Sequence, residues 1–181
     1  FKADWGQANL TRIAGWLNQE IGDRAPVGSE FSIHAGRGGA DAVDALEAGA
    51  VDIALATPAA AARLLYDGSG PVSRSAAPWL RALGSIAHRD RLVVAVDAAL
   101  PVRTVGDLAG IAPELVIATS QDDGINAIGL AAHYGLELAD ADPDLLRAAG
   151  ARFITDERPF PLVHAFAMGE ANVLIQEAVM M

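Results

Sequence analysis

The chain of 181 residues carries 13 Lys and Arg against 23 Asp and Glu, which gives a net charge of −10. Its 52% apolar and 20% charged residues are typical of a folded globular protein and not of a disordered chain. The acidic balance argues against general nucleic-acid binding, because phosphate recognition needs a concentrated cationic surface. The absence of Cys excludes disulfides, thiolate metal sites and a Cys nucleophile. Nor is any apolar run close to the ~20 residues of a membrane helix.

The first half of the chain predicts alternating helices and strands. Apolar residues at helical spacing predict a helix over residues 7–23, which Gly22 and Pro26 end. The glycine cluster at residues 36–39 separates a strand from the next helix, whose stop is Gly49. In chain order the remaining patterns predict strands at 31–35, 51–57, 80–86 and 92–96 and a helix that begins at Pro58 and ends near Asp67.

The second half continues the same alternation after a connector at residues 100–109. Strands are predicted at 115–119, 152–155 and 173–177, and helices at 124–134, 143–149 and 159–168. Strands that alternate with helices predict an α/β protein with a mostly parallel sheet.

One segment is repeated at long range. Residues 46–55 (LEAGAVDIAL) resemble residues 166–175 (FAMGEANVLI), so that Gly169 follows Gly49 by 120 positions. Each segment reads as a helix end, a Gly cap, an acidic or amide residue and a buried strand. The repeat favours two similar α/β lobes, residues 1–97 and 98–181, with the boundary near Asp97. The alternative is that two Gly-capped helices occur in any βαβ protein, and the pattern leaves it open.

Four segments, in this order, resemble a known family. They are GGADAVDALEAGAVDIAL at 38–55, the apolar segment 80–97, VGDLAG at 105–110 and GEANVLI at 169–175. Together they resemble the TAXI-type substrate-binding subunits of TRAP transporters, within the periplasmic binding protein type 2 superfamily. The resemblance implies a two-lobed clamshell outside the cytoplasm, which captures a small molecule between its lobes and delivers it to membrane transporter subunits.

Departures from the family concern both ends of the chain and one loop. The first strand and glycine-rich loop of the family are not recognisable before the first helix, so we expect that strand to lie upstream. The apolar end at Met181 predicts that C-terminal sequence is missing and returns to the first lobe. The loop at residues 119–124 carries Asp122 and Asp123 where many relatives have small neutral residues.

The glycine cluster is a candidate anion site. Backbone N–H groups at a helix start favour an anion, and Arg37 adds a bidentate contact to a carboxylate. It is not a dinucleotide fingerprint, because Asp41 occupies the third glycine position. A tight turn is the alternative explanation.

The loop at 119–124 has a structural explanation as well. One of Asp122 and Asp123 is explained as the N-cap of the following helix, and the other is then available for an amino group or a divalent cation. Arg37 on one lobe and an acid on the other would suit a zwitterion such as an amino acid. With strand-end positions added, the candidate ligand residues are Trp5, Arg37, Gly38, Gly39, Thr57, Ser120, Asp122, Asp123 and Glu177.

Motifs for metal binding and catalysis are missing. Asp140, Asp142 and Asp144 imitate the start of a calcium loop, but the required Gly and Glu are replaced, and Asp142 before Pro143 predicts a helix N-cap. The four histidines have no ligand spacing, and no nucleophile elbow or P-loop occurs. We therefore expect no metal, no cofactor and no enzyme activity. Two alternatives stay open, an effector-sensing domain of a transcriptional regulator and an α/β enzyme with the same cleft.

Overall fold

The computed structural model describes residues 2–4, 8–29, 31–36, 39–56, 59–69, 75–85, 91–121 and 126–177. The chain divides into two compact units, Phe1–Gly84 and Ser85–Met181. The protein has an α/β fold, as the alternating patterns predict, and its larger sheet is mixed.

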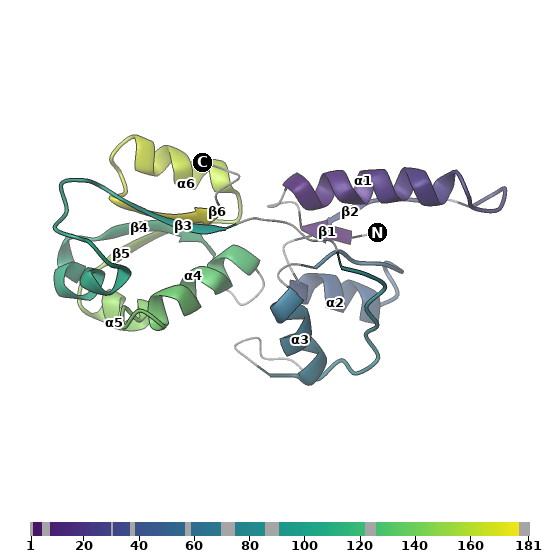
Figure 1. Ribbon diagram of the computed structural model, residues 1–181, viewed down its shortest axis with the longest axis horizontal. Helices are drawn as coiled ribbons and strands as arrows, with labels where there is room; N and C mark the ends of the chain where they lie inside the picture. The colour runs from purple at the N-terminus through teal and green to yellow at the C-terminus, as the bar shows by residue number, and fades with distance from the viewer. Residues whose placement is uncertain are drawn as a thin grey trace. The chain divides into compact units, whose positions relative to one another are not determined.

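The first unit contains a parallel pair of short strands with helices around it (Figure 1). Both α1 and α2 contact β1. Ala14 of α1, Val43 of α2 and Leu65 of α3 are among its most buried apolar side chains. In chain order its elements are β1 (Lys2–Asp4), α1 (Ala8–Gly22), β2 (His34–Gly36), α2 (Gly39–Glu47) and α3 (Ala59–Asp67).

Four sequence predictions differ from the structure of this unit. The strand predicted at 31–35 forms only at His34–Gly36. The sequence analysis expects the first strand to lie upstream, but β1 (Lys2–Asp4) precedes α1 and pairs with β2; its three residues are too few to show an alternating pattern. The apolar run at 51–57 contains no strand over its described residues and only an isolated bridge at Ala54. Residues 80–85 form no strand either. The sequence predicts strands for both runs because they are apolar, but an apolar run does not by itself supply a pairing partner, and residues 81–85 are exposed.

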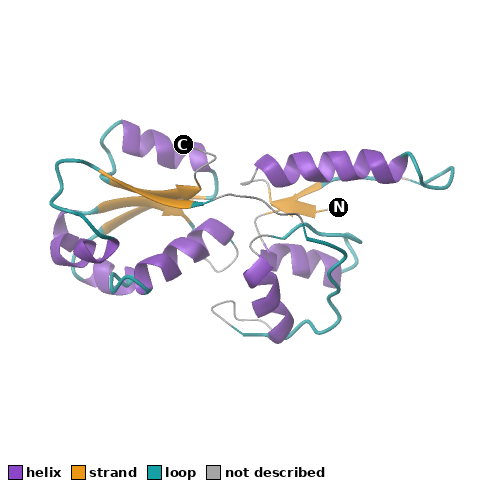
Figure 2. Ribbon diagram, in the orientation of Figure 1, coloured by secondary structure: helices purple, strands orange, loops and turns teal. Residues whose placement is uncertain are grey.

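The second unit is a four-stranded sheet with helices on both faces (Figure 2). The strand order is β3-β6-β4-β5; β6, β4 and β5 are parallel and β3 is antiparallel to β6. Its elements are β3 (Leu92–Val96), the 3-10 helix η1 (Val105–Glu114), β4 (Val116–Ser120), α4 (Ala127–Glu137), α5 (Pro143–Ala148), β5 (Arg152–Asp156), α6 (Pro159–Ala167) and β6 (Val173–Glu177).

The two faces of this sheet have separate cores. Alternate residues of a strand point to opposite faces. Ile117 of β4 and Ile175 of β6 therefore pack on the α4 face, with Leu136 of α4. Ala118 and Leu174 pack on the α6 face, in a cluster with Leu162, Ala165 and Ala171. The same alternation decides on which face of the sheet each polar side chain at the ends of β4 and β6 lies.

The division of the chain falls earlier than the boundary expected near Asp97. Strand β3, which the sequence assigned to the first lobe, pairs over its whole length with β6, Leu92 opposite Glu177 and Val96 opposite Val173. The second unit therefore begins at Ser85. A single strand sequence does not indicate which sheet the strand joins, since that depends on partners distant in the chain.

The repeated segment has the same backbone geometry in both places. Gly49 and Gly169 have φ values of +66° and +74°, in the left-handed region that favours glycine. After each glycine, two successive N–H groups donate to one carbonyl, that of Ala45 at 2.8 and 3.3 Å and that of Ala165 at 2.9 and 3.1 Å. Glycines with positive φ also follow α3 and α5, so the repeat is a helix end that this chain uses more than once.

Asn172 joins β6 to β4 at the start of both strands. Its side-chain oxygen accepts from the N–H of Val116 at 2.8 Å, and its side-chain amide donates to the carbonyl of Glu114 at 2.7 Å. The corresponding residue of the first segment, Asp52, is exposed and has no hydrogen bond to any described residue. The repeat therefore ends in a structural contact in the second unit only.

Helix α4 begins in direct contact with the end of β4. A Cβ placed on Gly129 would overlap the carbonyl group of Gln121 and lie 3.0 Å from the carbonyl oxygen of Ser120. A Cβ on Gly135, in the same helix, would meet only Leu92 Cδ2 at 3.8 Å, an ordinary contact. Only glycine at position 129 permits this approach of helix to strand.

We predict that Gly129→Ala destabilises the protein by about 1–3 kcal/mol, because backbone must move to admit the methyl group. The matched change Gly135→Ala should stabilise it by roughly 0.5–1 kcal/mol through helix propensity. Urea unfolding of both variants measures the difference. Equal effects at the two positions would show that α4 does not rest on the end of β4.

We predict that Asn172→Ala costs about 1–3 kcal/mol, because it leaves the Val116 N–H and the Glu114 carbonyl without their side-chain partner. Asp52→Ala is the control and should change the free energy of unfolding by less than about 0.5 kcal/mol. Denaturant titration followed by circular dichroism compares the two. A large effect of Asp52→Ala would mean that the first unit uses its segment in the same way.

Candidate functional site

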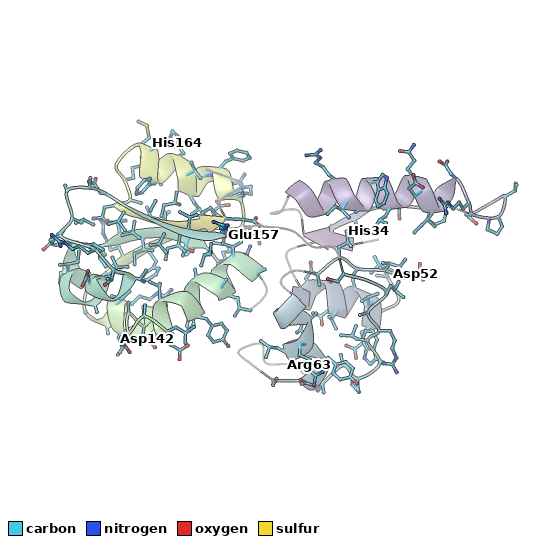
Figure 3. The ribbon with its side chains drawn as sticks, in the orientation of Figure 1. His34, Asp52, Arg63, Asp142, Glu157 and His164 are labelled. Carbon is cyan, nitrogen blue, oxygen red and sulfur yellow. The ribbon has the colours of Figure 1, made fainter. Side chains whose placement is uncertain are left out.

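The carboxyl ends of β4, β5 and β6 meet at one edge of the sheet in the second unit. The three strands are parallel, and the antiparallel β3 begins at the same edge. Glu157, which directly follows β5, lies there (Figure 3). Ligands of α/β sheets bind outside the carboxyl ends of strands, so the polar side chains at this edge are the candidates for ligand contacts.

Ser120 and Gln176 form a buried polar pair at the ends of β4 and β6. The Gln176 side chain is fully buried and its amide donates to Oγ of Ser120 at 3.3 Å. Its side-chain oxygen accepts from the N–H of Glu177 at 3.0 Å. Both groups of the amide are therefore used, and Gln176 holds the Ser120 oxygen as an acceptor. No described residue is recorded as accepting the hydroxyl proton of Ser120.

Glu177 and Thr119 lie on the opposite face, the one covered by α4. They alternate with Gln176 and Ser120 along the two strands, which places them on the same side as Ile117 and Ile175. Glu177 is 5% exposed and Thr119 is 4% exposed. Four neighbouring strand-end positions thus carry buried polar side chains, where core packing alone favours apolar residues.

Asp156 and Arg158 form an ion pair at the end of β5, beside Ser120 in the register of the sheet. Asp156 accepts from the Arg158 side chain through Nε at 3.2 Å and Nη2 at 3.3 Å, and from the Arg158 backbone N–H at 2.7 Å. The side-chain bonds first, and then the backbone bond, lower the pKa of Asp156 below its usual value. The pair fixes a guanidinium group at the candidate edge.

The start of α4 is capped by Asn126, not by Asp122 or Asp123 as the sequence suggested. Its side-chain oxygen accepts from the N–H of Ile128 at 2.9 Å and of Gly129 at 3.1 Å. The helix begins at Ala127, three residues after the predicted start, so neither aspartate is the cap. Capping therefore does not explain the two acids.

The structure describes three of the nine predicted ligand residues. Gly39 is the first residue of α2 in the first unit, while Ser120 and Glu177 end β4 and β6 at the candidate edge. The structure thus brings Ser120 and Glu177 to one edge of one sheet. The predicted residues Trp5, Arg37, Gly38, Thr57, Asp122 and Asp123 lie outside the described residues.

Thr119, Gln176 and Arg158 were missed by the sequence reasoning. Thr119 and Gln176 are polar residues within otherwise apolar strands, and that mismatch was the signal that could have identified them. Arg158 is the second residue after β5, but a charged residue after a strand is also typical of a solvated turn. Arg158 is held by Asp156, which pairs with Ser120 across β4 and β5, and this pairing depends on a strand order that the sequence does not contain.

The described residues offer little for catalysis or metal binding. They contain no group of three or more His, Asp or Glu side chains that could hold a metal ion. Ser32 Oγ and His34 Nε2 lie 3.0 Å apart, but both side chains are exposed and no described carboxylate contacts the other His34 nitrogen. Asp142 caps α5 through the N–H groups of Asp144 and Leu145, as predicted.

An apolar groove of about 680 Å³ lies elsewhere, in the first unit. It runs beside the second half of α1, where Trp16 is 60% exposed and Phe31 38% exposed. Its rim carries the exposed ion pair of Arg24 and Glu20, at 3.4 Å. Neither Ser120 nor Glu177 belongs to it, so it is separate from the candidate edge.

Comparison of the chain with protein-family models and with curated protein sequences found no match. Within the described part of the chain, no helix has the length and hydropathy needed to cross a membrane.

We predict that Asp156→Asn lowers stability near neutral pH and has less effect in acid. A carboxylate whose pKa is lowered by folding stabilises the native state above its unfolded pKa, near 3.8, and this contribution is lost as the pH falls through the folded value. Unfolding should be measured from pH 7 down to pH 2. A difference between variant and wild type that does not shrink in acid would show that the charge of Asp156 is unimportant.

Proposed function

We propose that this chain is a solute-binding protein of the TAXI type, which captures a small carboxylate-bearing metabolite and delivers it to a TRAP-type transporter in the membrane. The observation that carries the proposal is the group of buried polar side chains at one sheet edge: Thr119, Ser120, Gln176 and Glu177. Ser120 and Gln176 are hydrogen-bonded to each other, whereas the buried Thr119 hydroxyl has no partner among the described residues, and a bound ligand would supply one.

The proposed binding edge belongs to the second unit. Candidate ligand residues in the first lobe follow only from the resemblance to TAXI-type binding subunits. That resemblance implies a two-lobed clamshell of type 2 in which Arg37, with the glycines beside it, faces the ligand from the first lobe. Asp122 and Asp123 follow the end of β4, the strand that carries Ser120. Together these residues offer a cation for a carboxylate and acids for an amino group.

Binding rather than catalysis is supported by the kind of side chains at the edge. Hydroxyl, amide and carboxylate groups orient a ligand. Ser120 has an amide as its neighbour at 3.3 Å, and an amide cannot take its proton as a general base does. The family to which the resemblance points acts outside the cytoplasm, and we propose that location for this protein.

We predict that at least one member of a carboxylate panel stabilises the protein in a thermal-shift assay. The panel consists of glycine, L-alanine, L-leucine, L-aspartate, L-glutamate, L-lysine, pyruvate and succinate. A ligand that binds only the native state at a hundredfold excess over Kd adds about 2.7 kcal/mol. If no compound shifts the midpoint, the proposal is wrong.

Turnover of a bound compound would favour the enzyme alternative, and retention of the native protein in the cytoplasm after osmotic shock would favour the regulator.

We predict that Arg37→Ala and Asp123→Asn each weaken binding of the most stabilising panel compound by about tenfold to a hundredfold, the loss expected for a hydrogen bond to a charged group. Arg152→Ala is the control, because Arg152 is exposed at the opposite end of β5. Isothermal titration calorimetry gives the affinities. If both variants bind within fivefold of the wild type, these residues do not hold the ligand.

A further inference from the structure

Thr119 combines deep burial with an unsatisfied hydroxyl. It is the fourth residue of β4 and is paired on both sides, opposite Thr155 of β5 and Ile175 of β6. Its side chain is 4% exposed, and Oγ1 has no hydrogen-bond partner among the residues that the structure describes. Buried hydroxyl groups normally have a partner, so this one requires an explanation.

Packing does not explain a threonine here. The buried neighbours on the same face are Ile117, two residues earlier, and Ile175, directly opposite on β6, while Thr155 on β5 is exposed. Valine has nearly the same shape as threonine and would fill the position without burying a polar atom. The chain therefore keeps a side chain that costs stability, which proteins do where function needs it.

The position of Thr119 indicates what satisfies it. It directly precedes Ser120, whose oxygen already accepts from Gln176, and it lies on the other face of the same strand end. Glu177 shares this face and is 5% exposed. Thr119 thus presents a free donor and a free acceptor at the edge where the proposed function places the metabolite.

We infer that the Thr119 hydroxyl is a specificity-determining group, which completes its hydrogen bonding with a polar group of the bound metabolite. The inference rests on the proposed function, since it names a contact of the same site. It predicts two opposite effects of removing the hydroxyl. The free protein should become more stable, because a buried unpaired group is lost, and the ligand should bind more weakly, because a contact is lost.

The test compares Thr119→Val, Thr119→Ser and Thr155→Val with the wild type against the same carboxylate panel. Thr155 is the matched control, because it lies in the same row of the sheet but is exposed on the edge strand β5. Thr119→Val should raise the unfolding midpoint of the free protein by roughly 2–4 °C and weaken binding of the most stabilising panel compound by about tenfold. Thr119→Ser should bind within about twofold of the wild type, because it keeps the hydroxyl, and Thr155→Val should bind like the wild type.

Three results would overturn the inference. If Thr119→Val binds the panel compound as well as the wild type, the proposed function stands and the contact does not. If Thr119→Val lowers the unfolding midpoint of the free protein, the hydroxyl has a structural partner instead. If no panel compound stabilises the wild type, the proposed function fails and the inference fails with it.

Discussion

The parallel pairing of β4 with β6 is the constraint on which the second unit depends. Two side-chain contacts, each between residues 56 positions apart, fasten the strands near their ends: Asn172 with the Val116 N–H and Gln176 with Ser120. Closing a loop of that length costs conformational entropy, and both contacts help to offset it. Because β6 also pairs with β3, and β4 with β5, the register of this pair determines the position of every residue at the sheet edge.

The two side-chain contacts differ in the hydrogen-bonding groups that they leave for a ligand. The side-chain oxygen and the side-chain amide of Asn172 both bind backbone groups, so its side chain is committed to the structure. Gln176 is equally engaged, but no described residue is recorded as accepting the hydroxyl proton of Ser120. The contact at the start of the strand pair is therefore purely structural, while the contact at its carboxyl end lies where we propose that the ligand binds. A fixed, buried amide behind a hydroxyl restricts that hydroxyl to a narrow range of positions, which favours selective binding.

Local signals in the sequence predicted the helices well and the sheets less well. Gly22, Gly49 and the Asp142 cap act within a few residues, so the pattern around them is sufficient to place helix ends. Sheet membership is a long-range property, and the antiparallel pairing of β3 with β6 could not be read from the apolar run of β3. The strand-end rule selected Ser120 and Glu177, which end β4 and β6. It missed Thr119 and Gln176, whose importance depends on burial by neighbouring strands.

The position of β3 at the edge of the sheet has a consequence for how this protein behaves in concentrated solution. Its five residues, Leu92–Val96, are all apolar, and within the described part of the chain they pair with β6 alone. The opposite edge strand, β5, carries Arg152 and Asp156, charges of the kind that discourage pairing with another molecule. β3 has none of these protective residues. If the protein self-associates through strand pairing, we therefore expect the contact to form at β3 and not at β5.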